Sequence, residues 1–71
     1  MAKAKARTNL KLLRVKHGLT QEEFAALIGC NRGTYSAIES GKRNARGMFW
    51  RAIERTFPAE NIEELKKVDE D

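Results

Sequence analysis

Basic side chains are the residues of this chain whose types and placement best support a chemical role, and that role is binding. The 71 residues carry 14 Lys and Arg against 10 Asp and Glu, a formal net charge of +4. The first sixteen residues contain six basic side chains and no acid: Lys3, Lys5, Arg7, Lys11, Arg14 and Lys16. Positive charge concentrated on a small domain is typical of a protein that binds a polyanion, although surface lysines also serve solubility alone.

Catalytic and metal chemistry have little support in the sequence. Cys30 is the only cysteine and His17 the only histidine, so neither an internal disulfide nor a Cys/His zinc site can form. Glu22 and Glu23 are explained as acids at the start of a helix. We therefore expect no enzyme, no metal and no cofactor, with Cys30 a buried and unreactive thiol.

The chain also lacks the signals of a membrane or secreted protein. No apolar stretch approaches the ~20 residues of a membrane span. The first seven residues have no apolar segment of the kind that a secretory signal needs. A reducing cytoplasm is the simplest location, and a chain of this length has room for one domain with one small core.

Two short helices around a turn must position the polar groups between residues 20 and 43. Thr20 and Glu23 have the spacing of a capping box, in which each side chain bonds the backbone amide of the other residue. Gly29 follows directly after the apolar residues and predicts the end of this helix. Its inward side is expected to comprise Phe24, Leu27 and Ile28.

A third helix is predicted from Asn31, a favourable N-cap residue, to Gly41. Tyr35 and Ile38 would face inward, and the Tyr35 hydroxyl would be within reach of a phosphate. A step of about 100° per residue turns a set of small or polar side chains outward. These are Gly33, Ser36, Ala37 and Ser40, with Arg32 beside them.

The flanking segments are also helical in pattern. A first helix starting near Thr8 would bury Leu10 and Leu13, with or without Leu12. A fourth is expected over about 48–57, in a register centred on either Phe49 or Trp50. After Pro58, a weaker fifth helix carries Ile62, Leu65 and Val68, which form either a lid on the core or a dimer contact.

These segments predict an all-α fold of four or five helices. We expect a flexible basic arm over residues 1–8, a domain over 9–68 with its two-helix motif at about 21–40, and an acidic tail over 69–71.

The motif resembles the helix-turn-helix domain of the phage repressor and Cro family, also called the XRE-type family, over about residues 9–57. The resemblance is carried by Leu13-Arg14, Gly18-Leu19-Thr20-Gln21-Glu22-Glu23-Phe24-Ala25, Gly29 and Ile38-Glu39-Ser40-Gly41-Lys42-Arg43. It implies a compact lambda-repressor-like domain that binds operator DNA as a two-fold symmetric dimer, with the second motif helix in the major groove.

The resemblance also implies roles for individual residues. Base-reading positions are Asn31, Arg32, Gly33 and Ala37, of which Arg32 is suited to guanine and Asn31, if free of capping, to adenine. Gly33 and Ala37 either permit close approach to bases or are filler. Phosphate contacts fall on Gln21, Thr34, Ser36, Ser40, Lys42 and Arg43. Arg14 and Glu39 would form a structural ion pair between the first and third helices.

The function expected on these grounds is that of a sequence-specific regulator of transcription, a repressor of Cro or repressor type encoded by a bacterium or phage and associated with the nucleoid. Its partners would be double-stranded operator DNA and a second copy of the chain. One alternative is an antitoxin or a restriction-modification controller subunit with a protein partner. Another is an interaction or architectural module that does not read bases.

Overall fold

The second helix begins with the capping box that the sequence predicts. In the computed structural model, which describes residues 6–69, the Thr20 hydroxyl accepts a hydrogen bond from the Glu23 amide at 3.1 Å. The Glu23 carboxylate accepts one from the Thr20 amide at 2.8 Å. Helix α2 then runs over Gln21–Ile28 and ends at Gly29, whose φ of +77° lies in the left-handed region that favours glycine. Local bonds thus fix both ends of α2.

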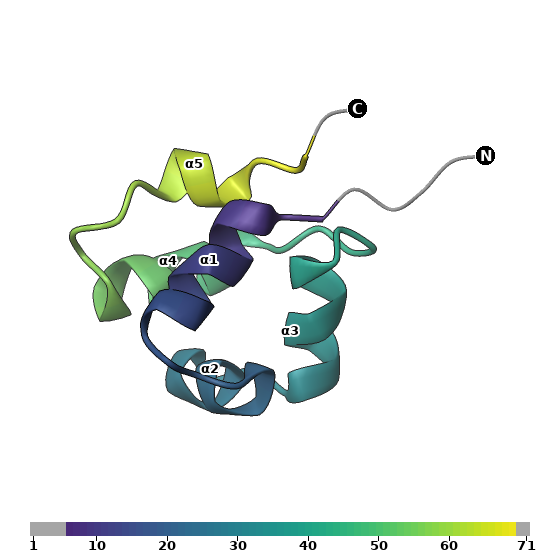
Figure 1. Ribbon diagram of the computed structural model, residues 1–71, viewed down its shortest axis with the longest axis horizontal. Coiled ribbons are helices and arrows are strands. Elements are labelled where there is room, and N and C mark those ends of the chain that lie inside the picture. Colours follow the sequence, from purple (N-terminus) through teal and green to yellow (C-terminus); the bar gives the residue numbers. More distant parts are fainter. Residues whose placement is uncertain (1–5, 70–71) are drawn as a thin grey trace.

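Five helices make up the described part of the chain, which contains no strand, so the all-α prediction is confirmed. They are α1 (Thr8–Lys16), α2 (Gln21–Ile28), α3 (Arg32–Glu39), α4 (Gly47–Thr56) and α5 (Ile62–Lys66). Figure 1 shows α2 and α3 meeting at one end of the molecule, with α1 crossing between them and α5. None of these helices is long and apolar enough to cross a membrane.

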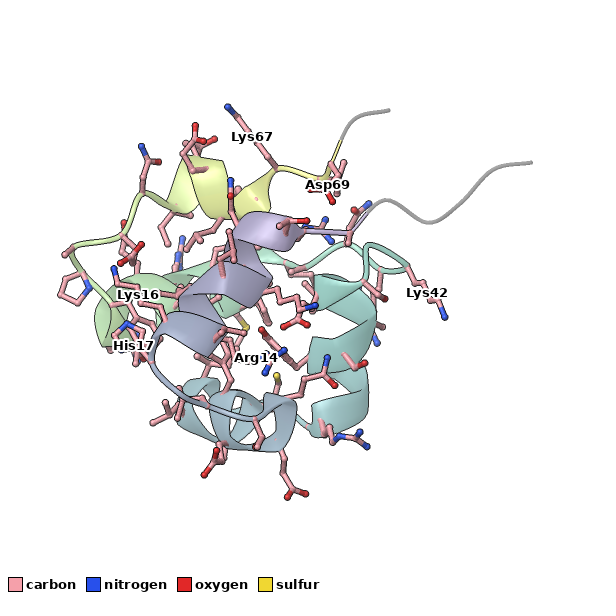
Figure 2. The ribbon with its side chains drawn as sticks, in the orientation of Figure 1. Arg14, Lys16, His17, Lys42, Lys67 and Asp69 are labelled. Carbon is pink, nitrogen blue, oxygen red and sulfur yellow. The ribbon has the colours of Figure 1, made fainter. Side chains whose placement is uncertain are left out.

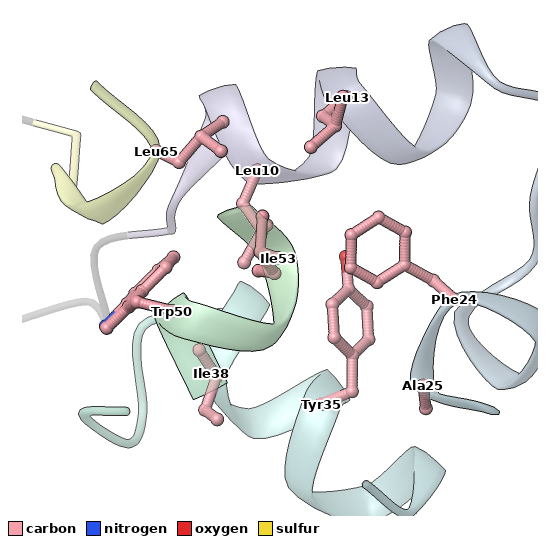
Figure 3. Packing of buried hydrophobic residues seen from close by; sticks show 9 residues of the cluster. All are labelled: Leu10, Leu13, Phe24, Ala25, Tyr35, Ile38, Trp50, Ile53 and Leu65. Atoms are coloured by element: carbon pink, nitrogen blue, oxygen red, sulfur yellow. The ribbon is translucent and has the colours of Figure 1, made fainter. Parts of the chain in front are cut away.

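One hydrophobic core joins all five helices. Figure 3 shows its nine buried members: Leu10, Leu13, Phe24, Ala25, Tyr35, Ile38, Trp50, Ile53 and Leu65. The rings of Phe24 and Tyr35 lie with centroids 4.8 Å apart, so α2 and α3 are held together by a direct aromatic contact. The orientation of α3 therefore depends on the same side chains that fill the core.

The register of α4 is the one centred on Trp50. Trp50 is 7% exposed and Ile53 is fully buried, whereas Phe49 is only partly buried at the edge of the core. The Phe49 ring stands edge-on to Trp50 at 4.9 Å and also faces Tyr35 at 6.3 Å. The aromatic cluster of this helix thus serves core packing.

The expected inward side of α2 was wrong at Leu27, which is 53% exposed. Phe24 and Ala25 are buried and Ile28 is partly buried. At about 100° per residue these three positions centre on a direction between Phe24 and Ala25, which leaves Leu27 about 100° away from that centre. The contact of α2 with α3 and α4 selects this orientation because the small Ala25 side chain permits close approach.

Helix α5 covers the core through Leu65, which is 4% exposed, in agreement with the lid interpretation for that residue. Val68 lies beyond the end of α5 and is 40% exposed. On α1, Leu12 is 56% exposed and contributes nothing to the buried cluster.

The boundaries expected for the arm and the tail differ from the structure. Thr8 already belongs to α1, and Arg7 is 5% exposed, so the part of the arm from Arg7 onward is folded. The Asp69 amide donates to the Ala6 carbonyl at 2.8 Å, and its carboxylate accepts a hydrogen bond from the Thr8 hydroxyl. The rest of the expected arm, residues 1–5, and the rest of the expected tail, residues 70–71, lie outside the described residues.

Candidate nucleic-acid interface

Helix α3 presents the predicted base-reading positions on its outer side. Tyr35 and Ile38 face the core, and the helical spacing turns Gly33 and Ala37 outward. Arg32 occupies the first position of α3 and is exposed. Its guanidinium has no hydrogen-bond or ion-pair partner within residues 6–69, so its donors remain available to a ligand.

Asn31 is committed to capping α3. Its side-chain oxygen accepts a hydrogen bond from the Thr34 amide at 2.7 Å. A bidentate contact with adenine needs both the oxygen and the NH₂ group of an asparagine side chain. The cap occupies one lone pair of the Asn31 oxygen and fixes its direction, whereas the Arg32 guanidinium keeps all its donors free within residues 6–69.

Gly33 is not required by the packing of the protein itself. A Cβ added at this position would meet only the Asn31 side-chain oxygen, at 3.5 Å, which is ordinary van der Waals contact. A glycine inside a helix is less stable than alanine by roughly 0.5–1 kcal/mol. Any need for glycine here must therefore come from a ligand that approaches the backbone of α3 closely.

The expected phosphate-binding residues divide into two groups. Thr34, Ser36 and Ser40 are partly buried, and the Ser40 hydroxyl already donates to the Ala37 carbonyl at 3.1 Å. Lys42 and Arg43 are exposed in the loop after α3, and Figure 2 shows the Lys42 side chain pointing away from the molecule. Their amides bond to the same Ala37 carbonyl at 2.9 and 3.2 Å, which ties the start of this loop to α3.

Arg7 holds the far end of α3, a role that the sequence analysis missed. Its guanidinium donates to the carbonyls of Ile38 at 2.7 Å and Arg43 at 3.1 Å, and to the Asn44 side chain at 3.1 Å. It also donates to the Lys66 carbonyl at 3.2 Å, and burial lowers the pKa of its guanidinium. Arg7 thus joins the loop that carries Lys42 and Arg43 to α5.

Glu39 is the centre of a second set of contacts, between α1, α2 and α3. It pairs with Arg14, whose Nε lies 2.9 Å from the carboxylate, and the Gln21 side-chain amide donates to it at 3.1 Å. The Tyr35 hydroxyl donates to it as well, instead of reaching outward toward a phosphate. Arg14 also donates to the Leu19 carbonyl at 2.8 Å, so the ion pair anchors the connection between α1 and α2.

The titration of this cluster follows from its hydrogen bonds. Burial acts to raise the pKa of Glu39, but hydrogen bonds from Arg14, Tyr35 and Gln21 outweigh it, and the pKa is lowered. The bond to Glu39 raises the pKa of Arg14, and burial together with that carboxylate raises the pKa of Tyr35. The cluster is therefore an ionised carboxylate held by three donors from three helices.

Gln21 lies at the start of α2, where the resemblance implies a phosphate contact. Its side-chain nitrogen carries two hydrogens, and one of them is used by Glu39. The second remains for a ligand. Gln21 thus connects the ion pair to the end of α2 where an anion is favoured.

Cys30 is partly buried beside the turn, not fully buried as the sequence suggested. Burial raises the pKa of its thiol, which keeps it in the less reactive protonated form. Within residues 6–69 no group of three or more His, Cys, Asp or Glu side chains is placed to hold a metal ion.

The capped α2, the turn at Gly29 and the exposed α3 define a helix-turn-helix domain. The chain belongs to the XRE-type helix-turn-helix family, whose model, described as Helix-turn-helix, matches residues 10–65. No solved structure gives a significant match.

Curated relatives carry regulatory names. An uncharacterized HTH-type transcriptional regulator of Methanothermobacter thermautotrophicus is 37% identical over 65 residues, covering 92% of this chain and 94% of that protein. A protein of the same description from Archaeoglobus fulgidus is 38% identical, covering 92% of this chain and 91% of its own length. Control protein C.MunI of Mycoplasma sp is 56% identical over 34 residues, 48% of this chain and 46% of that protein.

Proposed function

We propose that this protein is a sequence-specific regulator of transcription that binds double-stranded operator DNA as a homodimer and represses by covering its site. The observation that carries the proposal is the outer side of α3, where Arg32 stands free at the start of a capped helix. The names of the curated relatives support the regulatory role.

In the proposed complex, α3 lies in the major groove. Arg32 donates to O6 and N7 of a guanine, a contact worth ~1–3 kcal/mol of discrimination against the wrong base. The Ala37 methyl group faces a thymine methyl, and Gly33 permits close approach. Phosphates are bound by six residues, which set the register without reading sequence. These are Gln21, Thr34, Ser36, Ser40, Lys42 and Arg43.

Selection of bound duplexes from random DNA tests this proposal. A dimer is expected to select two inverted half-sites separated by about one helical turn, ~34 Å. Arg32→Ala should lose its preference at one base pair of each half-site. Lys42→Ala is the matched control, because loss of a phosphate contact weakens binding about equally on all sequences. Equal weakening by both variants on every duplex would instead support a module that does not read bases.

A controller subunit is the second candidate, favoured by the match to Control protein C.MunI over 34 residues, 48% of this chain. A restriction gene next to the gene for this protein, with a selected site between them, would support it. A neighbouring toxin gene and a stable complex with its product would indicate the antitoxin alternative.

A further inference from the structure

A pocket lies between α3 and α4, and its rim is basic. It has a volume of about 640 Å³. Thr34 and Ile38 of α3 form one wall, and Phe49 and Ala52 of α4 form another. Four arginines line it, and no acidic residue does. They are Arg43, Arg46, Arg51 and Arg55.

These arginines are free to bind a ligand. All four are exposed, and within residues 6–69 none has a side-chain hydrogen bond or ion pair. Arginine side chains in a folded domain commonly find acidic partners, as Arg14 does with Glu39. Four unpaired arginines around one pocket therefore create a local field that attracts an anion with several charges.

The pocket adjoins the side of α3 that would enter DNA. Thr34 and Ile38 each follow an outward position, Gly33 or Ala37, by one residue, which places them about 100° around the helix on the α4 side. A major groove is ≈ 12 Å wide, so its two backbones pass on either side of a helix that lies within it. With α3 in the groove, the backbone on the α4 side would pass across this pocket.

We infer that the pocket holds the sugar–phosphate backbone on the α4 side of α3, with Arg46, Arg51 and Arg55 as phosphate contacts in addition to Arg43. This inference rests on the proposed function. Positions 46 to 55 extend over about 13 Å along a helix axis, while one DNA strand carries a phosphate every ~3.4 Å of its axis, so the arginines span several phosphates. The apolar floor formed by Phe49 and Ala52 suits the deoxyribose carbons.

A second copy of this chain fits the same pocket poorly. In a two-fold dimer the same surface of both copies forms the interface. The four arginines of one copy would then lie near the four of the other, and the pocket lining contains no acidic residue to separate them. An acidic protein segment is the other anion that matches the charge, and it is distinguished from DNA by the test below.

The test measures the affinity of the full chain for a duplex selected from random DNA and for an unrelated duplex, at several salt concentrations. The double variant Arg51→Gln/Arg55→Gln should bind both duplexes on the order of tenfold more weakly at low salt, and its log–log salt slope should fall by about 1.8, or ~0.9 for each lost phosphate contact. Lys66→Gln/Lys67→Gln at the end of α5 removes the same charge away from the pocket and should change the slope little.

The outcomes separate this inference from the proposed function. Wild-type protein that binds no DNA overturns both. Wild-type binding with an unchanged slope in the arginine variant overturns only the inference and points to an acidic protein as the occupant. An equal loss in the lysine control also overturns it, because the effect would then be long-range charge. Arg46→Gln, outside the body of α4, provides a second variant if thermal melting shows that the double variant is unfolded.

Discussion

On the α2 side of α3, the Glu39 carboxylate accepts hydrogen bonds from Arg14, Gln21 and Tyr35, whereas on the α4 side four arginines have no partner within residues 6–69. The charged groups on the α2 side are paired within the protein. Those on the α4 side are exposed to solvent. The comparison shows how a small domain separates the groups that orient α3 from the charged groups that remain available to a ligand.

The two sides should accordingly respond differently to mutation. Changes on the α2 side should lower the stability of the fold and affect DNA binding only through the position of α3. Changes among the arginines should leave stability nearly unchanged, since exposed unpaired charges contribute little to it. Measuring the free energy of unfolding together with DNA affinity for each variant tests this separation.

The largest effect is expected for Glu39→Ala. The substitution leaves Arg14 and the Tyr35 hydroxyl without their acceptor in a mostly buried site, where side-chain exposure is 14% for Arg14 and 8% for Glu39. Removal of one partner of a buried pair costs about 3–5 kcal/mol, and we expect the lower end of this range. In a domain of this size the melting temperature should fall by more than ~10 °C.

Glu63→Ala is the matched control for Glu39→Ala, because it removes a carboxylate from an exposed pair with Lys66 on α5. Its melting temperature should stay close to that of the wild type. If Glu39→Ala melts at the same temperature as this control, Glu39 does not hold the α2 side of α3 in place.

Arg7→Met should have the next largest effect. The substitution removes the guanidinium that donates to the Ile38 and Arg43 carbonyls. Leaving these carbonyls partly unsatisfied should lower the free energy of unfolding by about 1–3 kcal/mol. Hydrogen exchange should become faster in the loop between α3 and α4, which follows Ile38. Lys11→Met, on the exposed side of α1, is the control. Unchanged exchange in the loop would show that Arg7 does not fix it.

The contacts of Arg7 show why only part of the site could be predicted from the sequence. The ends of α2 and α3 depend on residues three or four positions apart, such as Thr20 with Glu23, so local patterns predict them. The four partners of the Arg7 guanidinium lie between 31 and 59 residues away, and no local pattern specifies them. Its place within a basic, Ala-rich segment instead suggested a free arm.

The same limit explains the other differences. Leu27 has an apolar side chain at a plausible inward spacing, but its exposure depends on how α2 packs against two other helices. The use of Asn31 as a cap follows from its type and position, whereas the availability of Arg32 depends on its having no hydrogen-bond or ion-pair partner within residues 6–69 of the folded protein. Long-range packing thus decides which of the predicted polar residues are free.

The pH dependence of stability distinguishes the contribution of the Glu39 charge from that of its side-chain packing. Because the pKa of Glu39 is lowered in the folded protein, its charge stabilises the fold at pH values above the ordinary carboxyl pKa of ~4.3, and this contribution is lost as pH falls through the folded-state pKa. Glu39→Gln should cost about 1 kcal/mol at pH 7, the difference between charged and neutral hydrogen bonds. In urea unfolding, the free energies of unfolding of this variant and of the wild type should converge as the pH falls below the ordinary carboxyl pKa. A constant difference across this range would contradict a role for the charge.

The smallest expected effect is at Gly33, which lies between the two sides of α3. Since a Cβ there meets nothing closer than 3.5 Å, Gly33→Ala should stabilise the fold by roughly 0.5–1 kcal/mol through helix propensity. If DNA approaches the backbone at this point, the same variant should bind the selected duplex more weakly in spite of its greater stability. Thr56→Ala, at the exposed end of α4 and outside the proposed DNA contacts, is the control for a small change of the surface. If Gly33→Ala and the wild type bind the selected duplex with equal affinity, DNA does not approach the backbone closely at Gly33. Arg32 would then be the main residue proposed to read the base sequence.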